Sequence, residues 1–209
     1  MLRPSRLRAR LGTVLAALVI LAACAPARRG VFLTRDFADP ATAYGRELRE
    51  HTRSAELYSG FDTVAKAWAT WRSSALREAL VATTAARYRL GPDETERMRA
   101  EELRAVRLAW EFHVAVYTPS PDTNDLEKPD TLWRAVLELP DGSRGEPVQV
   151  VALPKNDKSR VEYPYVSPWT REYTLIFPKT AEPGPEVRPV LWLTGPYGTL
   201  RFDFGPSDR

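Results

Sequence analysis

Hydrophobic residues recur with a period of two along much of the second half of the chain. Phe112, Val114 and Val116 alternate with a second set of side chains that begins at His113. This is the period of a β-strand whose two faces meet different surroundings. Similar short runs predict further strands at Leu132–Leu139, Val148–Leu153, Glu172–Phe177, Arg188–Thr194 and Thr199–Phe204. The region from 112 to 204 is therefore predicted to be mainly β.

Two tight turns separate neighbouring strands of this set. Pro140-Asp141-Gly142-Ser143 follows one strand, and Gly195-Pro196-Tyr197-Gly198 joins the last two. Proline presets φ in such turns and glycine accepts positive φ. Short strands separated by turns of this kind are typical of a β-sandwich. We predict a mainly β fold of the α+β type, an Ig-like β-sandwich with a two-helix insertion after its first strand or strands.

The insertion is predicted from helix start and stop signals at about 73–111. Ser73 or Ser74 can cap a helix that runs to about Arg89, and Gly91-Pro92 supplies a stop. A second helix is expected from about 93 to 110, with acidic residues in its first turn. We expect its inward-facing stripe to be Leu103, Val106 and Trp110.

The stretch before these helices fits two structures. Val64, Trp68 and Trp71 would share one face of a helix, but the alternation through 64–70 also fits a strand. Gly60 would weaken a helix that continued through it. For 56–71 we favour a hairpin or a long strand that bends near Gly60, and we expect a short helix at 40–50.

The N-terminus carries an export signal. Residues 1–23 hold four arginines and no acidic residue, and a short apolar stretch runs from Leu11 to Ala23. A basic region followed by such a stretch is the pattern of a secretory signal peptide. The apolar stretch is too short to span a membrane, which takes about 20 apolar residues in a helix.

The end of this signal resembles the lipobox of bacterial lipoproteins. Leu21-Ala22-Ala23-Cys24 has small residues directly before Cys24, which is the chain's single cysteine. The resemblance covers residues 1–24 and implies a diacylglyceryl group on the thiol of Cys24, cleavage before this residue, and attachment to a membrane by lipid. The alternatives are a secreted protein with an unrelated cysteine at this position and an uncleaved anchor.

This resemblance also implies a cellular location and a domain plan. By similarity to the sorting rule of enteric bacteria, Ala25 instead of aspartate after the cysteine implies the outer membrane, with the protein facing the periplasm. We divide the chain into a signal peptide at 1–23, a lipidated tether at 24–39 and a single globular domain at 40–209.

Removing the signal changes the charge of the protein. The whole chain has 30 basic and 27 acidic residues, and four of the basic residues lie in 1–23, so that 26 basic and 27 acidic residues remain. The mature chain is thus close to neutral, with a formal charge of −1. Binding to nucleic acid calls for a basic domain, and we therefore expect no nucleic-acid partner.

No pattern of catalytic or metal-binding residues emerges. The two histidines, His51 and His113, have neither zinc-ligand spacing nor a nucleophile motif beside them. We interpret them as ordinary surface or half-buried residues. The Asp122–Glu127 loop is rich in oxygen ligands but lacks the order of a calcium loop, so turn formation is the simpler interpretation. Adjacent Glu101 and Glu102 point apart on a helix. We expect no enzyme activity, no metal and no cofactor.

One aromatic cluster is a candidate binding loop. The sequence Tyr163-Pro164-Tyr165-Val166-Ser167-Pro168-Trp169 lies in a predicted loop of the sandwich, where binding residues often occur. Tyr163, Tyr165 and Trp169 could anchor a protein partner or the face of a sugar. The interpretation we favour is structural, with the rings folded back over the edge of the sandwich.

These observations predict an envelope lipoprotein that acts as a non-catalytic accessory or scaffold domain and docks on another envelope protein. The alternative is a module that binds cell-wall or surface glycan through Tyr163, Tyr165 and Trp169. A glycan site should leave at least one of these rings exposed beside a groove, whereas a docking face should be a flatter apolar patch.

Overall fold

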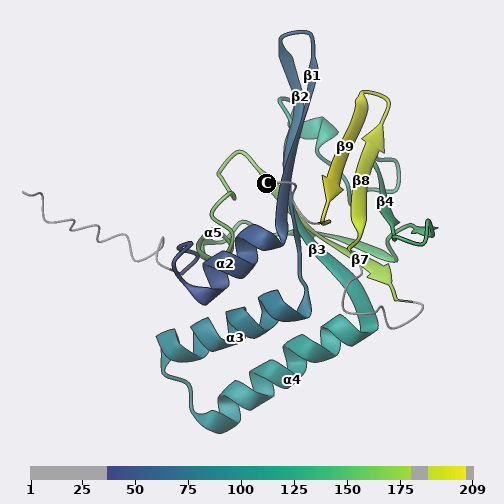
Figure 1. The fold of residues 1–209 in the computed structure, drawn as a ribbon. Helices are drawn as coiled ribbons and strands as arrows, with labels where there is room; N and C mark the ends of the chain where they lie inside the picture. The colour runs from purple at the N-terminus through teal and green to yellow at the C-terminus, as the bar shows by residue number, and fades with distance from the viewer. Residues whose placement is uncertain (1–36, 180–187, 206–209) are drawn as a thin grey trace, which may run out of the picture. The chain divides into compact units, whose positions relative to one another are not determined.

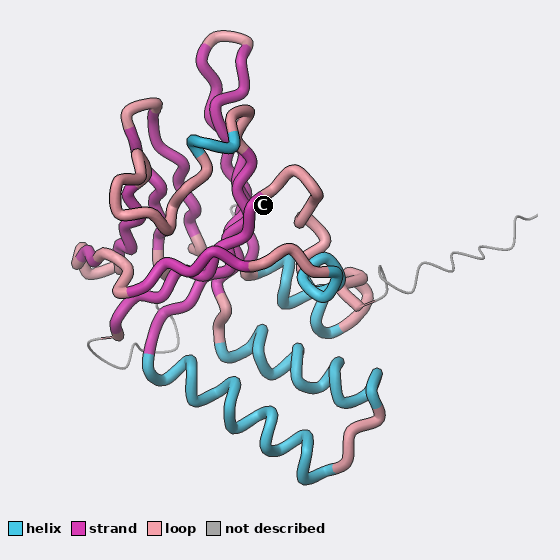
Figure 2. Tube along the Cα trace, turned by 180° about the vertical axis from the view of Figure 1, so that it is seen from behind, coloured by secondary structure: helices cyan, strands magenta, loops and turns pink. Residues whose placement is uncertain are grey.

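Two antiparallel sheets form the framework of the protein. The computed structural model describes residues 37–179 and 188–205 of the 209-residue chain, and the predicted signal peptide and Cys24 lie outside these ranges. The described strands form one sheet of five strands and one of four (Figure 1). Figure 2 shows from behind that the strands and the longest helices occupy different regions of the fold.

The five-stranded sheet has the strand order β1-β2-β3-β7-β6. Its strands are β1 (Thr52–Ser59), β2 (Asp62–Trp71), β3 (Ala109–Tyr117), β7 (Arg171–Pro178) and β6 (Gln149–Leu153). The second sheet has the order β5-β4-β8-β9. Its strands are β5 (Arg144–Gly145), β4 (Arg134–Glu138), β8 (Val190–Gly195) and β9 (Gly198–Asp203). All the described pairings are antiparallel.

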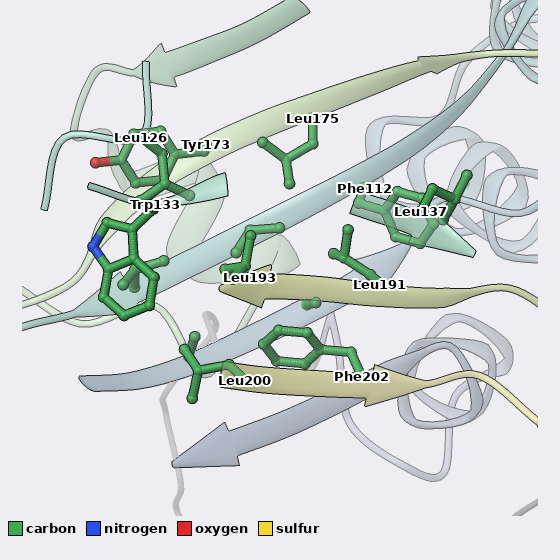
Figure 3. Packing of buried hydrophobic residues seen from close by; sticks show 14 of the residues in the cluster. Phe112, Leu126, Trp133, Leu137, Tyr173, Leu175, Leu191, Leu193, Leu200 and Phe202 are labelled. Atoms are coloured by element: carbon green, nitrogen blue, oxygen red, sulfur yellow. The ribbon is translucent and has the colours of Figure 1, made fainter. Parts of the chain in front are cut away.

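The main hydrophobic core lies between the two sheets. Leu191 of β8 and Phe202 of β9 are fully buried, as is Phe112 of β3 in the other sheet (Figure 3). Phe112 meets Phe177 edge-on with 5.9 Å between ring centroids, a favourable aromatic geometry. The prediction of a β-sandwich with a helical insertion is confirmed.

The stretch 56–71, for which the sequence allowed either a helix or a strand, belongs to a β-hairpin. β1 and β2 pair along their length, from Thr52 opposite Thr70 to Ser59 opposite Asp62. Gly60 adopts a φ of 61° in the turn, a conformation that costs little for glycine. The alternation through 64–70 therefore reflects a strand, and Figure 1 shows this hairpin running on beyond the other strands.

The helical insertion lies between two neighbouring strands, β2 and β3. It consists of α3 (Ser74–Tyr88) and α4 (Pro92–Leu108). The Oγ atom of Ser73 accepts a hydrogen bond from the backbone N–H of Leu76 at 3.2 Å, which is an N-cap. The predicted helical pair is confirmed, although the helices turn at Arg89, whose φ is 55°.

The predicted inward stripe of the second helix is wrong. α4 contains no buried side chain: Leu103 and Val106 are half-buried. Trp110 is buried, but it belongs to β3, where it pairs with Phe177. The strand begins three residues before Phe112 because pairing with β7 extends it, and this neighbour is not visible in the local sequence.

Further short helices cover the outer face of the five-stranded sheet. They are α2 (Ala43–Glu50) and α5 (Asp157–Glu162), with a 3-10 turn, η1 (Pro121–Thr123), in a connecting loop. The expected short helix at 40–50 is confirmed as α2. Phe37 and Ala38 are buried in a second hydrophobic cluster with Tyr44 and Leu48 of α2, so packed structure begins before Pro40.

Candidate functional site

Over residues 65–69, the two faces of β2 carry different kinds of side chain, small on one face and large on the other. Its small residues Ala65, Ala67 and Ala69 lie in the core between the sheets. Successive side chains of a strand point to opposite faces, so Lys66 and Trp68 lie on the outer face of the sheet. Both are half-buried, whereas Thr70, nearer the open end of the hairpin, is fully buried.

The loop before β7 presents an exposed tryptophan. Ser167 and Thr170 close a short turn: the Ser167 N–H donates to Thr170 Oγ1 at 3.0 Å, and Thr170 Oγ1 donates to the Ser167 carbonyl at 2.9 Å. Lys155 Nζ also donates to the Pro168 carbonyl at 2.7 Å. The Trp169 side chain is 78% exposed, and the turn therefore holds a large apolar ring in contact with water.

Trp169 borders a hollow on the surface of the sheet. The hollow has a volume of about 460 Å³ and is lined by Lys66, Trp68, Tyr117, Ser167, Trp169 and Thr170. Its walls combine aromatic rings with hydroxyl groups and an ammonium group. Such a mixture can pack against an apolar ligand surface and also form hydrogen bonds that orient the ligand.

The predicted aromatic cluster is split by the structure. Tyr163 is only 5% exposed, and its ring stacks on His113 with 3.8 Å between centroids. Tyr165 is half-buried and lies parallel to Trp68 at 6.2 Å. Burial raises the pKa of Tyr163 to about 12. Two of the three rings thus fold back, as the structural interpretation expects, and Trp169 alone remains exposed.

A chain of hydrogen bonds runs under the folded-back tyrosines. Thr70 Oγ1 lies 2.6 Å from the Tyr165 hydroxyl, which lies 3.0 Å from His113 Nδ1. His113 Nε2 is 3.0 Å from the Glu172 carboxylate. A carboxylate can only accept, so Nε2 carries the proton and Nδ1 accepts from Tyr165. Because both ring nitrogens are engaged inside the protein, this arrangement positions side chains and offers no free base to a ligand.

The histidines are not where the sequence interpretation placed them. His51 and His113 are both buried, not on the surface or half-buried. His113 points from the outer face of β3 into the layer covered by Tyr163. The local sequence around 113 shows a strand but not what covers its second face, and this explains the error.

These buried histidines predict a dependence of stability on pH. Burial lowers the pKa of His51 and His113 below the ordinary 6.5. The unfolded chain then binds protons at a higher pH than the folded chain, so the free energy of unfolding decreases as the pH falls below about 6.5. Each histidine can contribute at most about 1.4 kcal/mol per pH unit.

Urea unfolding between about pH 5 and pH 7 would measure this slope. We expect a shallower slope for His113→Gln, because glutamine does not titrate. Around His113 the titratable groups Tyr163, Tyr165 and Glu172 are unchanged in this variant, as are the nearby charges of Arg72 and Glu111. Equal slopes for the variant and the native chain would contradict the prediction.

A partly buried cluster of four charged side chains links the helical insertion to the sheet. Arg72 and Arg77 bond to Glu102 and Glu111, and we call these four residues the Arg–Glu quartet. Arg72 Nη1 lies 2.5 Å from Glu111 Oε1 and Nη2 lies 3.2 Å from Glu102 Oε2. Arg77 Nη2 lies 2.7 Å from Glu111 Oε2, and Nη1 pairs with Glu102. Burial opposes ionisation of Glu111, but the two arginines keep its pKa below the ordinary value.

The oxygen-rich loop at 122–127 has internal partners. Asn124 Nδ2 donates to the Val116 carbonyl at 2.8 Å, and Asp125 Oδ1 accepts from Thr131 Oγ1 at 2.9 Å. Glu127 pairs with Arg171. Within residues 37–179 and 188–205, no group of three or more His, Cys, Asp or Glu side chains could hold a metal ion.

Two of the aromatic residues that line the hollow, Trp68 and Tyr117, were not predicted from the sequence. Trp68 was considered as part of the ambiguous stretch 56–71, and Tyr117 was not singled out. The alternation of Lys66 and Trp68 with alanines was the available signal, because a strand with one small apolar face presents its other face to different surroundings. That Tyr117 lies beside Lys66 follows from strand pairing, which the local sequence does not contain.

Comparison with known proteins assigns neither a family nor a function to this chain. No family model, no curated protein and no solved structure matches this chain. In the part of the chain that the structure describes, no helix is long and apolar enough to cross a membrane.

Proposed function

We propose that this protein is a lipid-anchored domain of the bacterial envelope that binds a sugar ring of a cell-wall or surface glycan in the Trp169 hollow, without catalysing a reaction. The observation that carries the proposal is the exposed Trp169 ring, held by an ordered turn beside a hollow that contains Trp68 and Tyr117. Of the two functions predicted from the sequence, this geometry favours the glycan-binding alternative.

The chemistry of the hollow suits a carbohydrate. One face of a sugar ring is made of C–H groups, which can pack on an indole ring, while its hydroxyl groups need hydrogen-bond partners. Ser167 and Lys66 place a hydroxyl and an ammonium group around the same hollow, while the Thr170 hydroxyl holds the turn. The turn is held by bonds of its own, so less conformational freedom is lost on binding.

The location is proposed from Cys24 and the export signal. A lipid on Cys24 would hold the domain at the membrane, and Ala25 after the lipobox supports an outer-membrane location facing the periplasm, where cell-wall glycan is available. The mature chain has nearly balanced charge, with 26 basic and 27 acidic residues left after removal of 1–23. A neutral polymer is a suitable partner for such a protein.

Replacement of the exposed tryptophan tests this proposal. We expect Trp169→Ala to lower the affinity of the purified full chain for isolated cell-wall sacculi, measured by sedimentation, by about five-fold or more, because stacking and burial of one large aromatic ring contribute about 1–3 kcal/mol. Stability should change little, since the ring is exposed.

Phe61→Ala is the matched control for this measurement. Phe61 is a fully exposed aromatic residue in the turn between β1 and β2, and it does not line the hollow. Equal binding by the native chain and Trp169→Ala, or equal loss in both variants, would count against a glycan site at Trp169.

Docking on another envelope protein is the second candidate. The hairpin of β1 and β2 carries Phe61 and the half-exposed Tyr58 near its end, and exposed aromatic residues are frequent anchors in protein interfaces. In-cell crosslinking would test this function. A reproducible envelope partner that is lost in Phe61→Ala but kept in Trp169→Ala would support it.

A further inference from the structure

A second and larger cavity lies among the helices. It has a volume of about 550 Å³ and is bordered by α3, α4, α5 and Phe37. It shares no lining residue with the Trp169 hollow. Its size falls within the range of small-molecule sites, about 300–1,000 Å³.

The lining of this cavity is divided between apolar and charged side chains. The helices contribute Leu80 from α3, Met98 from α4 and Val161 from α5 to the apolar part. The charged part has two positive side chains, Arg72 and Lys158, and three negative ones, Glu102, Asp157 and Glu162. A ligand with one charged end and one apolar end would match both parts.

The charges of the cavity favour a cation. Arg72 is already bonded to Glu111 and Glu102 in the Arg–Glu quartet, whose two positive and two negative charges balance. Glu162 adds one further carboxylate. Its ion partner, Lys158, lies 3.6 Å away and has a side chain that is 82% exposed, and an exposed lysine binds a carboxylate only weakly.

The surroundings of Glu162 strengthen this argument. Its carboxylate is buried for the most part, with a side chain that is 18% exposed. Burial raises its pKa above the ordinary value, and Glu102 acts in the same direction, while Lys158 and Arg72 oppose them. A bound cation at this position would stabilise the carboxylate without competing for Arg72.

We propose that this cavity binds a small amphipathic amine. Its ammonium group contacts the Glu162 carboxylate, and its apolar body packs against Leu80, Met98 and Val161. The site is separate from the glycan function proposed above and does not depend on it.

Met98 allows a direct test. The chain contains two methionines, Met1 and Met98, so selective ¹³C-methyl labelling gives a spectrum in which Met98→Leu identifies the signal of the cavity. The full chain would be placed in phosphatidylcholine nanodiscs and titrated with hexylammonium. We expect a saturable shift of the Met98 signal, and no such shift with hexanoate, which has the same length and the opposite charge.

Three variants, one of them a control, separate the effect of charge on binding from the effect of cavity shape. Glu162→Gln should raise the Kd for hexylammonium about ten-fold or more, because it removes a charge-assisted hydrogen bond. Glu101→Gln, an exposed neighbour of Glu102 on α4, should leave the Kd unchanged. Thr84→Phe should fill the cavity and abolish the shift.

Three outcomes would overturn the proposal. They are an equal shift with hexanoate, an unchanged Kd in Glu162→Gln, and a persistent shift in Thr84→Phe. If Glu162→Gln does not fold, Thr84→Phe alone decides, since Thr84 lines the cavity without taking part in the charged group.

Discussion

Replacement of Arg77 with alanine is expected to lower the free energy of unfolding by about 3–5 kcal/mol, the usual result of removing one partner from a buried ion pair. The Arg77 side chain is 3% exposed and is the most buried member of the Arg–Glu quartet. Without it, the two half-buried carboxylates of Glu102 and Glu111 share Arg72 as their single cation, so one negative charge is left without compensation. Protonating that carboxylate or admitting water to it would each cost free energy.

The expected loss also follows from the position of the quartet. Arg77 lies on α3, Glu102 on α4 and Glu111 on β3, while Arg72 directly follows β2. α4 buries no side chain of its own, so hydrophobic packing holds this helix only weakly. The quartet therefore accounts for much of its attachment, and Arg77→Ala should also increase hydrogen exchange along α4 more than along the strands.

Urea unfolding of the native chain, Arg77→Ala and Arg99→Ala would measure the effect. Arg99 pairs with Glu78 at 2.7 Å between the same two helices, but both side chains are exposed to a large extent. A pair in water contributes little, so Arg99→Ala should change stability far less. Similar losses in the two variants would show that burial of the quartet does not matter.

Replacement of Cys24 with alanine is expected to abolish lipid attachment. The lipobox interpretation places a thioether-linked diacylglyceryl group on this thiol. Each buried methylene contributes about 0.8 kcal/mol to membrane binding, and two acyl chains hold a protein stably. The chain has one cysteine, so no other thiol could take over. Cells supplied with labelled palmitate should show label in the native chain and none in Cys24→Ala.

The same prediction also concerns cleavage of the signal peptide, and mass spectrometry would show at which residue the chain begins. The native chain should begin at a modified Cys24, and Cys24→Ala should retain residues 1–23 because lipidation precedes cleavage in this pathway. Ala25→Ser is the matched control, since it changes the next residue and keeps the thiol. Label in Cys24→Ala, or an unmodified Cys24 in the native chain, would refute the lipobox interpretation.

Much of the fold could be predicted because it depends on near neighbours. The cap at Ser73 involves Leu76, three residues away. The turn at 140–143 is closed by Leu139, whose N–H donates to the Ser143 carbonyl and whose carbonyl accepts from the Gly142 N–H, and Gly142 has a φ of 81°. Alternation identifies a strand whatever its partner is, which is why β3 was recognised although its start was placed three residues late.

The candidate site was predicted only in part. The 163–169 loop was singled out by composition, but composition does not say which way a ring points. Tyr163 turned inward because His113 offers a flat, buried surface on which it stacks. Trp169, held by the Ser167–Thr170 turn, instead stays exposed at the border of the hollow.

The sequence by itself determined the strand periodicity, the turns, the helical pair and the single thiol on which the prediction of a lipid anchor depends. Tertiary structure decided which side chains meet. Arg72 and Glu111 are 39 positions apart, Arg77 and Glu102 are 25 apart, and His113 and Glu172 are 59 apart. Local patterns record the conformational preferences of a few adjacent residues, whereas ion pairs, burial and hollows depend on which strands pair and which helices cover them.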